Sequence, residues 1–271
     1  MTTFSGHLRL EAERREDGRT VLARQSFRAP FHVGKPNWDG EVLQVRVVNA
    51  TAGILAGDRL ELGISVGPGA ALAVVTPAAT RAFVMRTGAA ECRQEYSVEA
   101  GGWLECAPEP LFPHRDTDYG QATRLRVAEG GETYWVELLA PGRAGRGERW
   151  SWRDLRLLLE VEFAGELVLR ERLSGPGEAL GRTAAFHGSR EAGFGTLVAC
   201  SARLGDDEGF WGRVRGAGAK DTRLGATRLR RGGWIVRVVA ADSPGLRDTM
   251  AALRALFAEK LPRLRSDLRR L

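Results

Sequence analysis

The residues best suited to acid and base chemistry gather in one proline-rich segment of the chain. Five titratable side chains fall within fourteen residues: Glu105, Glu109, His114, Asp116 and Asp118. A pair of carboxylates held at a fixed separation can protonate a leaving group and activate a nucleophile, as in glycoside hydrolysis. Asp residues in turns, however, usually accept backbone hydrogen bonds or face solvent. The segment therefore permits a β-rich hydrolase, but it favours a structural role for these acids.

Two further carboxylates occupy distinctive local surroundings. Glu137 lies in the apolar stretch TYWVELL at residues 133–139, where an ionised side chain must find a partner or reach water. We expect it to form an ion pair with an arginine such as Arg143. Asp58 directly precedes residues 59–66, which alternate strictly between apolar and other side chains and so predict a half-buried strand. Its carboxylate can cap the preceding turn.

Histidine and cysteine are too scattered to signal a metal centre. The chain has four histidines and three cysteines, at His7, His32, His114, His187, Cys92, Cys106 and Cys200. A tight metal site needs three or four convergent ligands, so we expect no tightly bound cofactor. The odd number and wide spacing of the cysteines fit a reducing compartment. The first residues lack the apolar run of a secretory signal, which makes a cytoplasmic location our expectation.

Nucleotide chemistry has no motif in this sequence either. Gly34-Lys35 is the only Gly-Lys pair, and a proline follows it instead of the Ser or Thr of a phosphate-binding loop. The zinc-hydrolase HExxH and the dinucleotide-binding GxGxxG patterns are also missing. We therefore expect that the chain is not an enzyme and that it does not itself bind or hydrolyse GTP.

The basic charge of the chain raises nucleic-acid binding as a further possibility. The net charge is +6 and the pI is about 9.8, and arginine-rich surfaces attract phosphate. Only three of the 40 basic residues are lysines, a skew that accompanies abundant Ala and Gly, and the charges alternate with acids along the chain. Composition alone explains such a balance, so we expect no nucleic-acid partner. No stretch of 18 apolar residues predicts a membrane span.

Strand patterns dominate the rest of the chain. Twelve segments predict strands: 7–12, 20–27, 41–48, 59–66, 71–76, 92–98, 123–127, 133–139, 155–163, 166–173, 196–204 and 234–240. Gly-containing turns at 66–69 and 162–165 predict hairpins, and residues 140–149 and 174–181 predict longer loops. One helix is expected near the C-terminus, where Asp242 or Ser243 can cap a run with Leu246, Met250, Leu253 and Phe257 at helical spacing.

Several turns of the chain resemble those of one known family. AGILAGD at residues 52–58 and TPAATRAF at residues 76–83 resemble the turns of the urease accessory protein UreD family, also called UreH. Further similar blocks cover residues 18–36, 103–123 and 137–150, and residues 234–257 resemble the usual end of the family. The order and spacing of these blocks make chance similarity an unsatisfactory explanation.

The resemblance implies a fold and a function. The fold would be mainly β, a single elongated β-helix-like stack of strands with a few helices, in one domain over residues 1–271. The protein would be a scaffold or chaperone that bridges apo-urease to a UreF-like accessory protein and a UreG-like GTPase. Nickel ions would pass through it in transit to the urease active site. Acidic positions in the similar motifs nominate candidate nickel-path residues, namely Asp58, Glu137, Glu148 and Glu171.

Overall fold

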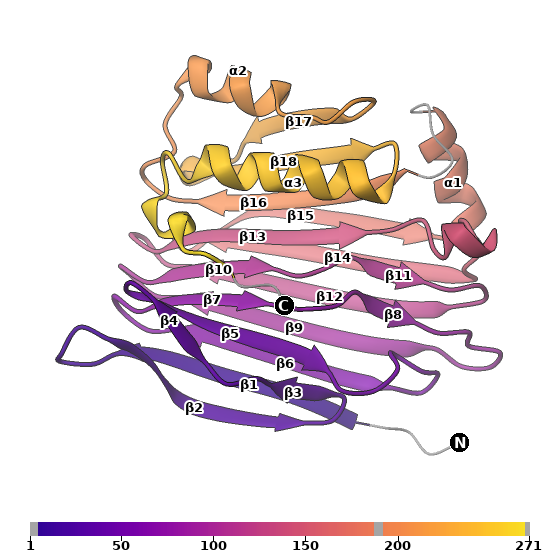
Figure 1. The fold of residues 1–271 in the computed structure, drawn as a ribbon, viewed down its shortest axis with the longest axis horizontal. Coiled ribbons are helices and arrows are strands. Elements are labelled where there is room, and N and C mark those ends of the chain that lie inside the picture. The colour runs from indigo at the N-terminus through magenta and orange to yellow at the C-terminus, as the bar shows by residue number, and fades with distance from the viewer. Residues whose placement is uncertain (1–4, 187–191, 269–271) are drawn as a thin grey trace.

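Two β-sheets face each other in the computed structural model, which describes residues 5–186 and 192–268 (Figure 1). The seven-stranded sheet has the order β15-β14-β12-β9-β6-β1-β2. Its strands are β1 (Ser5–Arg14), β2 (Thr20–Arg28), β6 (Arg59–Val66), β9 (Ala90–Val98), β12 (Asp118–Val127), β14 (Asp154–Phe163) and β15 (Glu166–Gly175).

The facing sheet is larger and has the main order β17-β18-β16-β13-β10-β7-β5-β3, with β4, β8 and β11 pairing at its margins. Its strands are β3 (Phe31–Val33), β4 (Asn37–Asp39), β5 (Val42–Asn49), β7 (Ala71–Val75), β8 (Thr80–Ala82), β10 (Trp103–Ala107), β11 (Leu111–Pro113), β13 (Glu132–Leu139), β16 (Gly193–Cys200), β17 (Arg223–Arg228) and β18 (Gly233–Ala240).

The middle of the chain coils between the two sheets. From β6 to β14 the chain alternates between them, so that β6, β9, β12 and β14 lie parallel in one sheet and β7, β10 and β13 lie parallel in the other. The result is a β-solenoid-like stack of about four turns, as the family resemblance implied. The prediction of a hairpin at 66–69 was wrong, because this turn carries the chain from β6 across to β7 in the opposite sheet. The hairpin at 162–165 is confirmed between β14 and β15.

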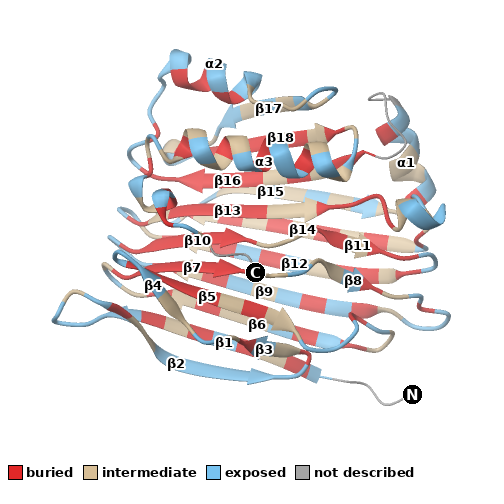
Figure 2. Ribbon diagram, viewed as in Figure 1, coloured by how far each residue is buried: buried red, intermediate tan, exposed pale blue. Residues whose placement is uncertain are grey.

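The two sheets differ in burial because only one of them is covered on both faces (Figure 2). Strand β14 alternates between intermediate and buried residues along its whole length, as expected for a strand with one face in solvent. Strands β7 and β10 are buried at every position. The difference follows from α2, α3 and the segment after α3, which cover the outer face of the larger sheet.

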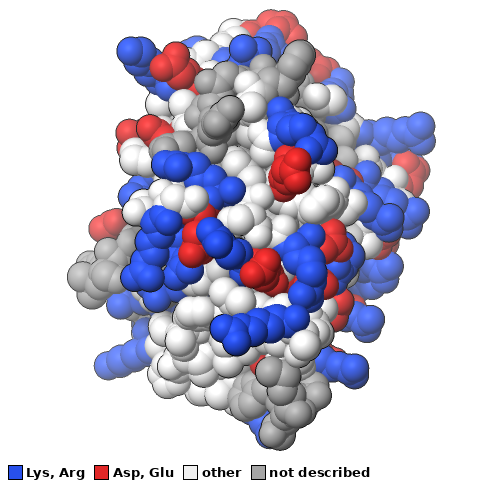
Figure 3. Space-filling model, turned by 90° about the vertical axis from the view of Figure 1, so that its right-hand side faces the viewer, with Lys and Arg blue, Asp and Glu red and all other residues white. Residues whose placement is uncertain are grey.

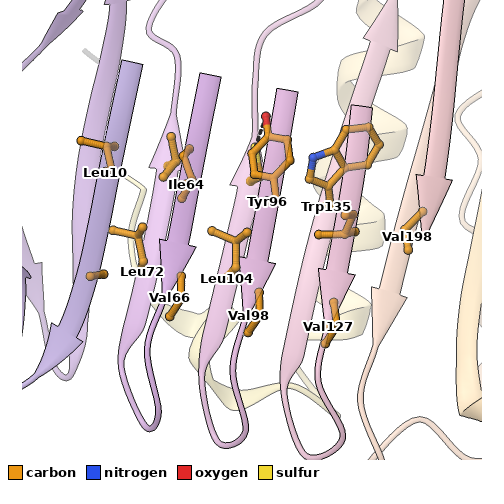
Figure 4. Close-up of a cluster of buried hydrophobic side chains, with 14 of the residues drawn as sticks. Leu10, Ile64, Val66, Leu72, Tyr96, Val98, Leu104, Val127, Trp135 and Val198 are labelled. Carbon is orange, nitrogen blue, oxygen red and sulfur yellow. Dashed lines mark hydrogen bonds between the residues drawn. The ribbon is translucent and has the colours of Figure 1, made fainter. Parts of the chain in front are cut away.

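The main core lies between the sheets (Figure 4). Leu10, Ile64 and Tyr96 project inward from the seven-stranded sheet, and Leu72, Leu104 and Trp135 meet them from the larger sheet. Ile64 and Tyr96 are register partners, so each coil adds an apolar side chain to the same row. Full burial of each such side chain contributes about 1.5–3 kcal/mol, and the stacked rows therefore hold the coils together.

Three helices occur in the described residues: α1 (Gly177–Phe186), α2 (Glu208–Gly216) and α3 (Ser243–Phe257). The expected C-terminal helix is confirmed as α3, with the Asp242 carboxylate accepting a hydrogen bond from the Gly245 N–H. Its apolar face packs with α2 on the larger sheet in a second core. Short 3-10 turns span Ala144–Arg146, Arg230–Gly232 and Pro262–Arg265.

All twelve expected strands are present, but six others escaped the sequence pattern: β3, β4, β8, β10, β11 and β17. The loop expected at 174–181 was wrong in part, because β15 extends to Gly175 and α1 begins at Gly177. Two tryptophans in non-alternating segments differ in burial. Trp38 is exposed, whereas Trp211 is fully buried and stacks on Trp234 with ring centroids 3.5 Å apart.

Candidate functional site

A cavity of about 140 Å³ lies between the two sheets, and part of its wall is polar. Strand alternation places these groups there, since residues two apart on β9 or β12 point the same way. Most of the lining is apolar, including Leu60, Leu62 and Leu157. The polar and thiol side chains of the lining are Asn49, Thr76, Thr80, Cys92, Gln94, Tyr96, Cys106, Glu109, Tyr119, Gln121 and Glu137.

Hydrogen bonds connect the polar groups of the cavity and orient them. The Tyr119 hydroxyl donates to Oε1 of Gln121 at 3.0 Å, and Nε2 of Gln121 donates to Oε1 of Glu137 at 2.5 Å. On the neighbouring strand, the Tyr96 hydroxyl donates to Oε1 of Gln94 at 3.0 Å. These contacts fix the direction of each amide and leave oxygen atoms on the inside of the molecule.

Glu137 is the most perturbed acid of this interior. Burial, reinforced by the nearby Glu171 carboxylate and opposed by the Gln121 hydrogen bond, raises the pKa of Glu137 to about 7. The expected ion pair with Arg143 was wrong, because Arg143 pairs instead with Glu148. Glu137 is therefore a half-buried carboxylate between the two sheets without a basic partner among the described residues, and it borders two cavities.

A second, smaller cavity of about 90 Å³ shares Glu137 and Leu157 with the first. Glu171, on β15, and Arg237, on β18, line it from the two sheets, and Nη2 of Arg237 lies 2.8 Å from Oε1 of Glu171. Burial raises the pKa of Glu171, while the Arg237 charge opposes that change. Glu137, Thr196 and Arg237 lie in one cross-strand row. Two of the four candidate path residues, Glu137 and Glu171, thus meet at one place.

The other two candidates have different surroundings. Asp58 accepts a hydrogen bond from the Leu55 N–H at 2.8 Å and so closes its turn, while burial raises its pKa. Glu148 forms a double contact with Arg143, at 2.7 and 2.9 Å, which lowers the pKa of Glu148. Neither residue lines either cavity. A role for them in nickel transit stays a prediction.

The thiols of the first cavity are held in a weakly ligating form. Burial raises the pKa of Cys92 to about 11 and that of Cys106 to about 12, so both remain protonated at neutral pH, whereas metals bind the thiolate. Within residues 5–186 and 192–268, no three His, Cys, Asp or Glu side chains converge as a metal cage. His187 lies outside the described residues.

Three of the four acids of segment 105–118, namely Glu105, Glu109 and Asp118, form separate ion pairs. Glu105 is completely buried beneath α3 and pairs with Arg254 at 2.6 Å, whereas Asp118 pairs with Arg156 at 2.8 Å at the start of β12. Glu109 borders the first cavity, whereas Glu105 and Asp118 line neither of the two cavities described above. Residues 63–67 match the GxSxG spacing of a hydrolase elbow, but Ser65 lies within β6 instead of at a strand-to-helix turn. The geometry gives no support to the hydrolase interpretation.

The end of the molecule on the right of Figure 1 contains the turns that define the family resemblance. Ile54 bridges to Ala82, and the Ile54 N–H donates to the Arg81 carbonyl, which joins the two turns directly. Gly53 has φ +152°, and a Cβ there would lie 2.4 Å from the Arg81 oxygen, so this contact requires glycine. Motifs about 25 residues apart thus form one structural unit, as parallel coils require.

Charge on this end is mixed (Figure 3). Arginine and lysine side chains predominate, but acidic side chains lie between them, and several are joined in ion pairs such as Arg153 with Asp118. This pattern differs from the continuous basic stripe of a nucleic-acid-binding surface. Of the helices in the described part of the chain, none combines the length and apolar character needed to cross a bilayer.

Comparison with known proteins is consistent over nearly the whole length. The family model described as UreD urease accessory protein matches residues 5–270. Urease accessory protein UreD of Opitutus terrae is 46% identical over 270 residues, covering 99% of both chains. The same-named protein of Cereibacter sphaeroides is 31% identical over 86% of this chain and 84% of its own, and that of Acetivibrio thermocellus is 26% identical over 89% and 93%. The chain therefore belongs to the UreD family of urease accessory proteins, which implies a role in urease maturation.

Proposed function

We propose that this protein is a non-enzymatic scaffold of urease maturation, and that nickel crosses it between the two sheets. It would bridge apo-urease to a UreF-like protein, which in turn recruits a UreG-like GTPase. The observation that carries the nickel proposal is the position of Glu137, between two internal cavities, with Gln121 and Glu171 beside it. Membership of a family of urease accessory proteins supports the maturation role.

The chemistry of the interior suits an ion that must leave again. Divalent nickel accepts carboxylate and amide oxygen as well as nitrogen ligands, and it binds thiolates strongly. The cavity offers oxygens from Gln94, Gln121 and Glu137, while its two thiols stay protonated. Conduction needs binding strong enough for entry and weak enough for exit. An interior with few charged ligands meets that condition.

The charge of Glu137 also fits transit. A carboxyl group with a pKa near 7 is partly protonated at neutral pH when no cation is near. A divalent cation beside it favours the ionised form and displaces the proton. The Glu137 carboxyl would therefore be negatively charged while a nickel ion lies beside it. It would take up a proton again after the ion has left.

The surface features that fit a scaffold are open strand edges. Strand β2 ends the seven-stranded sheet and is exposed over most of its length. Trp38 is 42% exposed on β4. Unpaired edges and exposed aromatic side chains are typical places for partner binding or for unwanted association. These features support partner binding.

Isosteric substitutions in a co-expressed urease system test the nickel proposal. Glu137→Gln and Glu171→Gln remove the interior charges with little change in shape, and we expect urease complexes to assemble but urease to contain less nickel. Glu95→Gln is the matched control, because Glu95 lies exposed on β9, in the same sheet as Glu171. Complex yield and urease-bound nickel should be measured together. Full nickel loading with the Glu137→Gln/Glu171→Gln double variant would refute the passage.

A further inference from the structure

The interior passage contains a positive charge that a path for cations would not be expected to have. Arg237 lies on the inner side of β18 and lines the smaller cavity, where its guanidinium contacts Glu171 at 2.8 Å. A fixed cation at this point repels a divalent ion and occupies the carboxylate that such an ion would use. Glu171 is therefore already neutralised by Arg237 when no metal ion is present.

The Arg237–Glu171 pair closes the open edge of the solenoid. Strand β15 is the edge strand of the seven-stranded sheet, and β18 is one strand from the edge of the larger sheet. No further coil covers the space between them in the described residues. The pair thus links the two sheets across the cavity at the place where the stack of coils ends.

The contacts of Arg237 are incomplete, in contrast to those of a permanently buried ion pair. Nη1 of Arg237 is buried and has no hydrogen-bond partner among the described residues, and an unsatisfied buried N–H carries a free-energy cost. Arg254 differs, because its guanidinium holds both oxygens of Glu105 and also donates to the Ser266 carbonyl. Arg254 is therefore firmly held, whereas Arg237 gives up a single contact when it moves.

The surroundings of the pair leave room for that movement. The side chains of Arg237 and Glu171 are 41% and 27% exposed, whereas the Glu105 side chain is 0% exposed. A long arginine side chain can place its charged end in water while its stem stays on the sheet. Arg237 can thus leave Glu171 without unfolding of β18.

We infer that Arg237 is a tethered counter-cation, which competes with the divalent cargo for Glu171 and keeps this end of the passage closed until it swings away. The inference rests on the proposed nickel passage, and it adds a specific gatekeeping residue. Arg237 neutralises Glu171 when no cargo is present, so the free chain does not accumulate metal there. A cation that reaches Glu137 advances to Glu171 only by displacing the guanidinium.

Calorimetric titration of the purified full chain with Ni²⁺ alone tests this inference. Arg237→Met keeps the approximate length of the side chain and removes its charge. We expect Ni²⁺ to bind this variant on the order of tenfold more tightly than the wild type. The reason is that one unit charge a few ångströms away changes the affinity for a divalent ion by about that factor even in water. Arg237→Lys keeps the charge and should remain close to the wild type. Arg231→Met is the matched control. Arg231 pairs with Glu166, which lies on β15 as Glu171 does, but Arg231 lines neither cavity.

The outcomes separate this inference from the proposal beneath it. Unchanged or absent Ni²⁺ binding by Arg237→Met, or an equal gain in Arg231→Met, overturns the competition. Arg237→Gln replaces Arg237→Met if thermal melting shows that the Met variant is unfolded. If Arg237→Met binds Ni²⁺ more tightly but Glu137→Gln/Glu171→Gln still loads urease fully, the competition stands and the passage fails. If Arg237→Met binds Ni²⁺ as the wild type does, while Glu137→Gln/Glu171→Gln lowers the nickel content of urease, the passage is supported and the gating role of Arg237 is refuted.

Discussion

Replacement of Glu137 by Gln should change how the stability of the protein depends on pH. The pKa of Glu137 rises from 4.5 to about 7 in the folded protein, mainly because of burial. Each pKa unit corresponds to 1.36 kcal/mol, so the ionised side chain makes folding less favourable by at most about 3 kcal/mol. Residual solvation from the adjoining cavity reduces this figure. Gln has a similar shape and no charge to bury.

The direction of the effect follows from proton binding. Between pH 4.5 and about 7 the folded protein retains a proton on Glu137 that the unfolded chain has released. The free energy of unfolding of the wild type therefore falls through this window as pH rises. The advantage of Glu137→Gln over the wild type should be absent near pH 4.5, grow with pH, and reach its full value above pH 7.

Urea unfolding followed by tryptophan fluorescence at pH 5, 6, 7 and 8 measures this difference. Titrating groups distant from Glu137 contribute almost equally to both proteins, so the difference between them reports the titration of Glu137 together with its coupling to Glu171. Glu95→Gln controls for the loss of one negative charge, because Glu95 is exposed on β9. Parallel curves for the wild type and Glu137→Gln across this range would refute the assignment of a buried, unpaired carboxyl group to Glu137.

Four further outcomes are expected. Arg254→Met should lower the free energy of unfolding in urea by about 3–5 kcal/mol, because it removes the guanidinium that pairs with the buried Glu105 carboxylate; a loss below 1 kcal/mol would contradict this. Asp58→Asn should cost about 1 kcal/mol or less, since Asn can still accept the Leu55 hydrogen bond; complexes that assemble but deliver urease with less nickel would place Asp58 on the transit path, and full nickel loading would leave it a turn residue. Calorimetry with GTP and Mg²⁺ should detect no binding to the isolated chain, and stoichiometric binding would overturn that expectation. Expressed alone, the chain should self-associate through its open edges, and a UreF-like partner should keep it in solution; size-exclusion chromatography showing a stable monomer whose pull-downs lack that partner and urease would argue against the scaffold.

Local pattern was sufficient to predict most of the strands. The alternation in residues 59–66 indicates one apolar face, and β6 occupies that range. It was less informative for β10, because this strand is buried on both faces and has no alternation. The C-terminal helix was predictable because its cap residue, its early proline and its apolar spacing agree, as α3 shows.

The coiling of the chain could not be read from a repeat in the sequence. The register partners Leu60, Cys92, Gln121 and Leu157 differ by 32, 29 and 36 in residue number. Connections of unequal length hide the period while the strands remain aligned. A turn such as 66–69 also has the same composition whether it joins neighbouring strands or crosses between sheets, so the hairpin prediction failed there.

The sequence by itself determined the local elements and, through its turn motifs, the family to which the chain belongs. Tertiary structure alone decided that Glu137 and Glu171 line one cavity, that Arg143 pairs with Glu148 instead, and that Arg237 contacts Glu171. The physical reason is that a strand specifies which side chains share its face, with a period of two, whereas their neighbours across the core depend on how distant strands align and which sheet lies opposite. Acids from β13 and β15 meet only because the coils place those strands in facing sheets.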